Sequence, residues 1–589
     1  MRVSRLFAVP VLLTMAAGAA AQTQVKATTH ALELIPAQAQ VVVYFPDLKS
    51  LEAKWSKVVG HFGGKDGFLK LQGQTGIDPS RLGPGPLLRV SFRDSSAAET
   101  WVWLLPAKDP QAALTGLKPK GTGGVWTWEA PAPPPKAHPK MQAKAPAPAP
   151  RFGTAKGGYL VVADREASLA AFKKPARTLS VELAPYATWM ARHDVSVVVT
   201  RAAVEEAARS ASQSFKRPPA EPKDGEKPAK PGAKLVARLQ AKLDRWAELA
   251  KTSVHHVLGS LDISEGGGLM VEARALLSPG SPLSRELETL PPVVGHPLKG
   301  LATSDFALAF GGEWTALFDF QSAFMEDLDK GGKVQPATLA RLQKAMEFQS
   351  GLTRSMAAIF SAPAPRGSMM SGLISLVRVS DSQAYLAAME ETSKAQRAFF
   401  QDLGMPEAVS FSRDILPGVP SCGMTTRLDL KNEDPAAASA RAAMAMIFGG
   451  ESIQMSMGAL DDHRLLAVMG NPELLKARME ALQKTPEAIA LSILAVEPDL
   501  GRDYRFALYL DPRGIRDLAQ VVVGIFGGST EKQLPIIPEV PAAGFTLSLD
   551  PSVVELRGSV RAETLDATAT LVKAIGALLA EKRMGEAKP

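Results

Sequence analysis

Two short patterns in this 589-residue chain contain residue types that carry out chemistry. The first, Ser529-Thr-Glu-Lys532, is an S-x-x-K pattern, in which a lysine one helical turn away activates a serine nucleophile. The S-D-N and K-T-G motifs that accompany such a serine in penicillin-recognising enzymes are missing, and a four-residue pattern arises by chance in a chain of this length. The sequence therefore does not favour a catalytic serine here.

The second pattern is a pair of M-x-M sequences, Met444-Ala-Met446 and Met455-Ser-Met457. Thioether sulfur is a soft ligand for Cu(I), and Met455 and Met457 point to the same face if they lie on a strand. The same spacing fits a buried strand face, where methionine fills irregular gaps in a core. The core interpretation is favoured, and Cu(I) binding is the alternative.

The remaining candidates are cysteine and histidine. Cys422 is the only cysteine, so the chain forms no internal disulfide, and its place at the start of a probable strand predicts a buried apolar residue. His255 and His256 are expected on a helix, where neighbours diverge by about 100° and do not face one metal. Asp461-Asp462-His463 is expected to form a hairpin turn rather than a metal site. We therefore predict no catalytic, cofactor-binding or metal-ligating residue.

The N-terminal segment predicts export. Arg2 and Arg5 precede an apolar run at residues 6–15, and Ala19 and Ala21 provide the small side chains of a signal-peptidase site. An apolar run of about ten residues is well below the ~20 that span a bilayer. Residues 1–21 are therefore a predicted signal peptide for the general secretory route, and the mature chain has no expected transmembrane segment. The protein would be periplasmic or secreted.

Charge is concentrated in two proline-rich stretches, near 130–156 and 216–234. These stretches and the signal peptide account for the net charge of +7, which leaves the rest of the chain close to neutral. No aromatic residues interleave the basic ones, so nucleic acid is not an expected partner. Both stretches are predicted to be flexible insertions, because they contain too little apolar surface to offset chain entropy.

Helix starts are the clearest local signals. A side-chain oxygen followed by proline places an N-cap before the first helical residue. This pattern occurs at Asp109-Pro110, Asp434-Pro435, Asn471-Pro472, Thr485-Pro486 and Asp511-Pro512. Apolar residues at helical spacing predict long helices over about 233–258 and over 381–403, the second ended by Gly404.

Five sequence blocks recur in the same order along the chain. The matched blocks are 39–55 with 305–320, 90–113 with 409–438, 157–172 with 463–479, the segment from His193 with that from Arg502, and 259–287 with 545–571. They predict a duplication into halves at 22–300 and 301–589. The expected class is α+β, with mainly antiparallel strands covered by helices in β-α-β-β-α units that are partly ferredoxin-like.

Three segments carry a resemblance to a known family: ELIPAQAQVVVYFPDLKSLEAKW, QTGIDPSRL and YLVVADREASLAAF. They resemble an exported bacterial family known as a domain of unknown function, in which a Pro-Ala turn leads into a strand, a short turn and a helix, often duplicated. The resemblance implies this strand-turn-helix module. It implies no activity, substrate or catalytic residue.

Composition and the absence of catalytic motifs together leave two classes of function. The chain is 46% hydrophobic and 22% charged, which excludes a disordered, collagenous or polytopic membrane protein. We favour a non-catalytic envelope protein that binds a small ligand or another envelope protein, or that has a structural role. The alternative is an envelope hydrolase whose site is assembled only in the fold.

The signal peptide leads to a direct test. We expect the exported protein to begin at Gln22, because cleavage after Ala21 fits the small residues at positions 19 and 21. N-terminal sequencing and intact mass of the exported protein check this, and a mature protein that still begins at Met1 would contradict it.

Overall fold

The computed structural model describes most of the chain from residue 27 onward. The described residues are 27–64, 67, 71–93, 99–122, 124–130, 150–173, 175, 177–215, 244–245, 247–290, 293, 295–301, 306–313, 334–361, 368–405, 408–427, 447–450, 452–484, 489–501, 503–526 and 533–586. The predicted signal peptide, most of the first proline-rich stretch and all of the second lie outside them.

The fold is α+β, as expected, and the chain divides into two compact units. Unit 1 comprises Met1–Ala211, Ala247–Thr289 and Asp550–Glu555, and unit 2 comprises Ser212–Trp246, Leu290–Leu549 and Leu556–Pro589.

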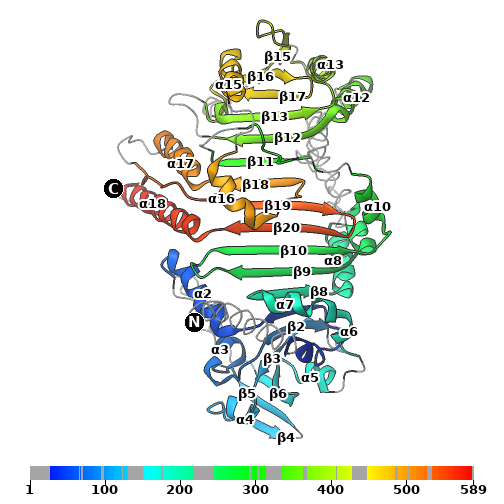
Figure 1. The fold of residues 1–589 in the computed structure, drawn as a ribbon, viewed down its shortest axis with the longest axis vertical. Helices are drawn as coiled ribbons and strands as arrows, with labels where there is room; N and C mark the ends of the chain where they lie inside the picture. The colour runs from blue at the N-terminus through cyan, green and yellow to red at the C-terminus, as the bar shows by residue number, and fades with distance from the viewer. Residues whose placement is uncertain are drawn as a thin grey trace, which may run out of the picture. The chain divides into compact units, whose positions relative to one another are not determined.

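Unit 1 is built on antiparallel strands (Figure 1). They are β1 (Val41–Phe45), β2 (Leu87–Arg93), β3 (Glu99–Pro106), β4 (Lys120–Thr122), β5 (Val125–Glu129), β6 (Pro150–Lys156), β7 (Tyr159–Ala163), β8 (Val195–Val199), β9 (Val254–Ile263) and β10 (Leu269–Leu277). Their pairings give the order β10-β9-β8-β1-β2-β3-β7-β6-β5-β4, and every pair is antiparallel.

One face of this sheet carries the main core of unit 1. Alternate residues such as Val42, Leu88 and Val90 have no exposed surface and pack against Phe172 and Leu183. The helical segments of the unit are residues 27–32, α2 (Leu48–His61), α3 (Leu71–Thr75), η1 (Pro79–Arg81), α4 (Pro110–Ala113), α5 (Glu166–Lys173), α6 (Ser180–Leu183), η2 (Ala184–Tyr186), α7 (Ala187–Arg192), α8 (Arg201–Phe215) up to Ala211, residues 247–253 and α10 (Pro282–Glu288). Because strand side chains alternate, the neighbours of these core residues point to the opposite face.

Unit 2 is also built on antiparallel strands. Its strands are β11 (Leu308–Gly312), β12 (Thr353–Phe360), β13 (Leu373–Val379), β14 (Val409–Arg413), β15 (Ser421–Arg427), β16 (Ser452–Asp461), β17 (Arg464–Met469), β18 (Phe506–Leu510), β19 (Ala543–Asp550) and the second part of β20 (Val553–Val560). Pairings from β19 onward give the order β19-β18-β11-β12-β13-β17-β16-β15-β14.

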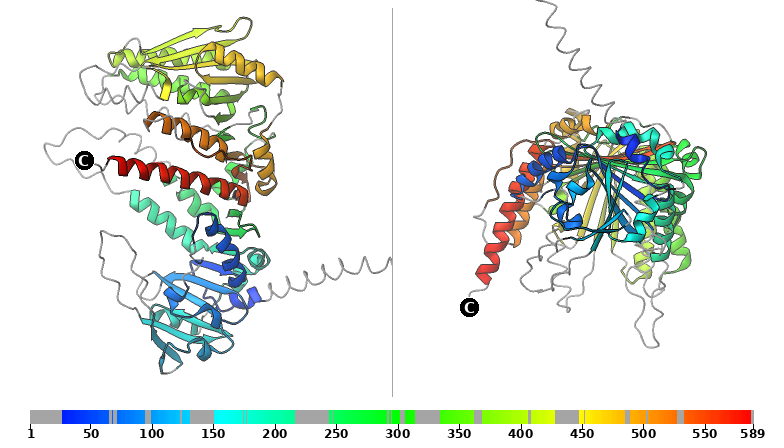
Figure 2. Two further views of the ribbon diagram at one scale, coloured as in Figure 1. Left: turned by 90° about the vertical axis from the view of Figure 1, so that its left-hand side faces the viewer. Right: turned by 90° about the horizontal axis from the view of Figure 1, so that it is seen from below.

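The helical segments of unit 2 are α12 (Pro336–Leu352), η3 (Met369–Gly372), α13 (Ser382–Asp402), α15 (Pro472–Lys484), α16 (Leu491–Leu500), α17 (Pro512–Phe526) and α18 (Ala562–Glu586). Its largest core cluster includes Phe306, Leu466, Val496 and Tyr509. α17 and α18 contact each other and lie side by side, orange and red in Figure 2.

Several predicted helix boundaries are confirmed. α4, α15 and α17 begin at the prolines after Asp109, Asn471 and Asp511, and each of these side chains accepts backbone N–H bonds from the first turn. α13 begins after its N-cap Asp381, and Gly404, at φ +83°, follows its C-terminal end. Asp434-Pro435 and Thr485-Pro486 lie outside the described residues.

Two predictions are wrong. Helix does not continue to 258, because the helical residues end at 253 and Val254 begins β9, where backbone pairing with β8 and β10 outweighs the helical spacing. Residues 150–156 are not part of a flexible insertion. They form β6, between β5 and β7, and the Arg151 and Lys156 side chains donate to the carbonyls of Gln74 and Phe172.

Two helical glycines of unit 2 give a matched test of packing. A Cβ at Gly514 in α17 would clash with the backbone carbonyl of Phe306, whereas a Cβ at Gly576 in α18 would meet nothing within 4 Å. We expect Gly514→Ala to lower the free energy of unfolding by about 1–3 kcal/mol through overpacking. Gly576→Ala should raise it by about 0.4–1 kcal/mol through lower unfolded-state entropy. Urea unfolding followed by circular dichroism checks both signs, and an equal response would contradict the packing.

Candidate functional site

The sulfur-containing candidates lie in the core of unit 2. Cys422 on β15 is paired with Met457 on β16, and both are buried in a cluster with Tyr385 and Met389. Burial raises the pKa of the Cys422 thiol to about 12, so the thiol stays protonated at neutral pH. Met455 packs against the same cluster, as the core interpretation expects. The other chemical candidates, Ser529, Lys532, Met444 and Met446, lie outside the described residues.

The adjacent histidines lie on β9 instead of the expected helix. His256 is buried, and its Nε2 is 2.7 Å from Glu182 Oε1 on α6, while its Nδ1 is 3.0 Å from His255 Nδ1. Desolvation lowers the pKa of His256, with the His255 charge as a smaller cause. No cluster of three or more His, Cys, Asp or Glu side chains suited to a metal occurs among the described residues.

The acidic triplet forms the predicted turn between β16 and β17. Asp461 Oδ1 accepts the His463 backbone N–H at 2.9 Å, and Asp461 Oδ2 accepts Arg464 Nε at 2.6 Å. The His463 ring lies 2.9 Å from the Ser380 carbonyl oxygen. These hydrogen bonds engage the Asp461 carboxylate and the His463 ring and stabilise the turn.

A histidine–carboxylate pair in unit 1 was not predicted. His193 Nδ1 lies 2.7 Å from Asp262 Oδ2, and Asp262 Oδ1 accepts the Asp194 N–H. The Asp194 carboxylate in turn accepts Lys54 Nζ at 2.8 Å and the Ile263 N–H. The network joins α2, the segment before β8 and the end of β9.

This pair resembles two members of a hydrolase triad, in which a carboxylate orients a histidine. A triad also needs a hydroxyl or thiol at the other ring nitrogen. Within the described residues, no such group hydrogen-bonds to His193 Nε2, and the Trp189 ring packs on the imidazole at a centroid distance of 4.8 Å. The described contacts of this pair instead hold α2, the segment before β8 and the end of β9 together.

A second buried polar cluster lies in unit 2 around His296, whose side chain is 7% exposed. His296 Nδ1 accepts the Leu298 N–H at 3.0 Å, so the neutral ring carries its proton on Nε2, 3.5 Å from Tyr509 Oη. Tyr504 and Tyr509 hydroxyls lie 3.1 Å apart. Burial, with the charge of Arg378 as a smaller cause, lowers the pKa of His296 to about 4. The cluster therefore keeps a neutral histidine at physiological pH.

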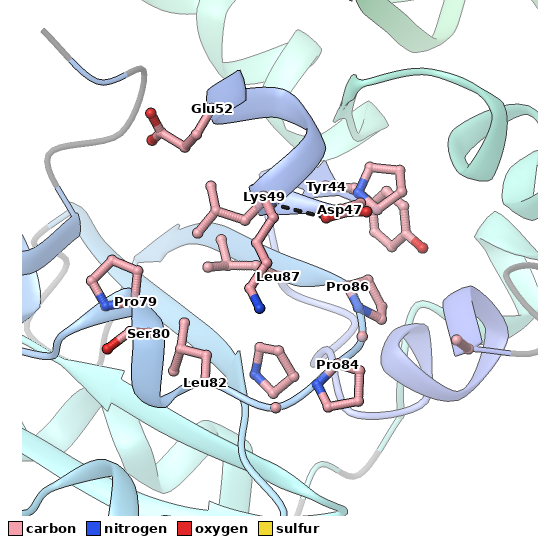
Figure 3. Close-up of a pocket in the computed structure, with 16 residues that line it drawn as sticks. Tyr44, Asp47, Lys49, Glu52, Pro79, Ser80, Leu82, Pro84, Pro86 and Leu87 are labelled. Carbon is pink, nitrogen blue, oxygen red and sulfur yellow. Dashed lines mark hydrogen bonds between the residues drawn. The ribbon is translucent and has the colours of Figure 1, made fainter. Parts of the chain in front are cut away.

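A cavity of about 760 Å³ in unit 1 is the strongest candidate for a binding site (Figure 3). It lies between the first turns of α2 and the loop that leads from η1 into β2. The residues around it are Ala27, Tyr44, Pro46, Asp47, Leu48, Lys49, Glu52, Pro79, Ser80, Leu82, Gly83, Pro84, Gly85, Pro86, Leu87 and Pro106. Proline and leucine dominate this set, so most of the wall is apolar.

Local sequence explains how this wall is held. Asp47 Oδ1 accepts the N–H groups of Lys49 and Ser50, which caps α2 immediately after β1. On the side of the cavity opposite α2, the Gly83 N–H donates to the Pro106 carbonyl oxygen at 2.7 Å. Gly85 has φ +135°, a conformation that residues with a side chain rarely adopt. A cap on one side and a proline-rich loop on the other therefore fix the shape of the cavity.

The polar groups at the cavity have different surroundings. The buried Tyr44 hydroxyl lies 2.5 Å from Thr28 Oγ1, and burial raises the pKa of Tyr44 to about 12. The Asp47 carboxylate is engaged by the helix N-terminus. The Lys49 amine extends into the cavity below α2, whereas the Glu52 carboxylate points away from it (Figure 3). The cavity thus combines an apolar wall with an accessible ammonium group.

Sequence reasoning missed this site. Its best signal was the segment PSRLGPGPL at 79–87, in which prolines and glycines impose a fixed loop beside a strand, but such residues usually indicate an ordinary turn.

No family model, curated protein or solved structure matches the chain. In the part of the chain that the structure describes, we find no helix with the length and apolarity to cross a bilayer.

The His296 cluster predicts acid sensitivity. Between about pH 6.5 and pH 4, the unfolded histidine binds a proton that the folded one does not, so the free energy of unfolding falls as the pH falls. His296 alone accounts for a loss that approaches about 3 kcal/mol. Urea unfolding at pH 7.5 and pH 4 should show a smaller acid loss in His296→Gln than in the wild type. An equal loss in the two proteins would contradict this origin.

Proposed function

We propose that this protein is exported and binds a small ligand in the unit 1 cavity without transforming it. The cavity carries the proposal, because its volume of about 760 Å³ lies in the range of small-molecule sites and its wall is mostly apolar with a few polar groups. The same non-catalytic class also includes two other roles: binding of another envelope protein, and a structural role in the envelope.

The polar groups at the cavity support binding rather than catalysis. Tyr44 is a weak proton donor with its hydroxyl bonded to Thr28, and Asp47 already accepts two backbone N–H groups. General acid–base chemistry needs a group whose pKa lies near the working pH and within reach of the substrate. A tyrosine pKa near 12 does not meet that need, whereas an ammonium group beside an apolar wall suits recognition.

Export is part of the proposal. The N-terminal pattern at residues 1–21 supports secretion through the general route to the periplasm or beyond. Cleavage after Ala21 leaves a short segment before Ala27, which lies at the cavity. The cavity therefore belongs to the mature chain.

We also propose that the two halves, 22–300 and 301–589, arose by duplication. The strand order supports this: β9-β8-β1-β2-β3-β7-β6-β5-β4 in unit 1 corresponds, position by position, to β19-β18-β11-β12-β13-β17-β16-β15-β14 in unit 2. Similar β-α connections support it too, since β7 leads into α5, β17 into α15, β8 into α8 and β18 into α17.

The strand order revises one of the five matched blocks. It pairs β2 and β3 with β12 and β13, not with β14 and β15 as the match of 90–113 with 409–438 required. The sequences after β3 and β13 agree with the revision, since KDPQAAL at 108–114 is similar to SDSQAYL at 380–386. Both segments begin a helix after an aspartate cap.

The alternative, an envelope hydrolase, rests on the His193–Asp262 pair. If the pair were catalytic, His193→Gln would abolish hydrolysis of ester or amide substrates while the protein remained folded. The described contacts of Asp262 and Asp194 with backbone N–H groups favour a structural role instead.

Recovery of the native ligand tests the proposal. We expect the full mature protein, purified from its native envelope, to retain a small molecule in about equimolar amount that mass spectrometry detects after denaturation. Ser80→Trp should abolish retention, because a bulky side chain from the exposed Ser80 position fills the cavity.

Ser56→Trp is the matched control, since Ser56 is an exposed serine of α2 that does not line the cavity. Equal retention by both variants would place the ligand elsewhere. Conversion of the recovered molecule by the wild type, lost in His193→Gln, would support the hydrolase instead.

A further inference from the structure

We propose that the unit 1 cavity selects an organic anion, a compact ring or hydrocarbon body that carries one carboxylate or sulfonate group. This inference rests on the proposed function of the cavity as a small-ligand site. Two observations support it. Two cations, Lys49 and Arg89, have no described carboxylate partner, and the cavity wall has few hydrogen-bond donors.

The first cation is Lys49. Its amine extends into the cavity toward Leu87 (Figure 3), and within the described residues no acceptor hydrogen-bonds to it. The two acidic groups at the cavity do not neutralise it, because Asp47 accepts backbone N–H groups and the Glu52 carboxylate points the other way. A ligand anion can therefore pair with the Lys49 ammonium.

The second cation is Arg89 on β2. Leu88 and Val90 point into the main core, so Leu87 and Arg89 share the opposite face, about 7 Å apart along the strand. Leu87 lines the cavity, which places Arg89 one side-chain position beyond it.

Arg89 has an unusual environment for a guanidinium. Its Cζ lies 4.0 Å from the Trp101 ring centroid and 5.2 Å from that of Trp103, and its Nε is buried without a hydrogen-bond partner. Within the described residues, no carboxylate forms an ion pair with it. Burial lowers the pKa of Arg89, so the cation is held with little solvation. Arg89 does not line the cavity, so its positive charge acts on a bound anion only from beyond the lining residues.

The wall determines the rest of the ligand. Pro79 in η1 and Pro84 and Pro86 in the loop that follows it have no N–H group, and the N-terminus of α2 is capped by Asp47. A phosphate group requires several backbone or side-chain donors around it. Proline rings instead present CH₂ groups that pack on a ring or hydrocarbon chain. A monoanion with an apolar body therefore fits better than a phosphorylated ligand.

Two fluorescent probes with the same ring system test the charge preference. 8-Anilinonaphthalene-1-sulfonate carries a sulfonate, and N-phenyl-1-naphthylamine is its neutral counterpart. We expect the full mature protein to bind the sulfonate more tightly. Lys49→Met should weaken sulfonate binding roughly fivefold, by about 1 kcal/mol, and leave the neutral probe unchanged. Lys173→Met is the matched control, since Lys173 is an exposed lysine of unit 1 outside the cavity.

Arg89 is tested with the same pair of probes. Arg89→Met should weaken sulfonate binding while Arg89→Lys retains most of it, and unchanged binding of the neutral probe shows that the cavity stays intact. Equal effects of Lys49→Met and Lys173→Met, or tighter binding of the neutral probe, would overturn the anion preference. If Ser80→Trp displaces neither probe, the cavity itself is not the site and the proposed function fails first.

Discussion

Antiparallel backbone pairing positions almost every side chain of interest in this protein. Each residue has a fixed partner on the next strand, and that partner determines which face of the sheet the residue occupies. The register of β1 with β2 places Leu88 in the core and Arg89 on the opposite face. The register of β15 with β16 places Cys422 beside Met457 in another core. A shift of one residue would exchange buried and accessible groups in both units.

Strand pairing also buries several histidine side chains, and these need hydrogen-bond partners inside the protein. Ionisable groups taken from water need partners, and the His193, His256 and His296 rings all find them in other elements, at Asp262, Glu182 and Tyr509. Each cluster contains residue types found in active sites. Their described contacts are with carboxylates, tyrosines and backbone groups that join separate segments, which is how a fold with a single cysteine holds distant parts of its chain together.

Local sequence patterns predicted what depends on local interactions. Proline after Asp109, Asn471 and Asp511 identified real helix starts, because an N-cap acts within one turn. Long-range pairing was harder to foresee. β6 was hidden because Arg151 and Lys156 looked like the end of a basic insertion, and their contacts with Gln74 and Phe172 come from far along the chain. The cavity was missed for the same reason, since residues 44–52 and 79–87 meet only in the fold.

The rigid loop at Gly83–Leu87 has a consequence for how this protein can change over time. A loop held by proline rings, by a positive φ at Gly85 and by the Gly83–Pro106 hydrogen bond cannot easily reshape itself around a new molecule. Diversification of the cavity must then proceed through the size of individual side chains such as Leu82 and Leu87. Proteins that share this loop would then differ in ligand selectivity through small changes in the volume of the lining side chains, while the backbone around the cavity stays the same.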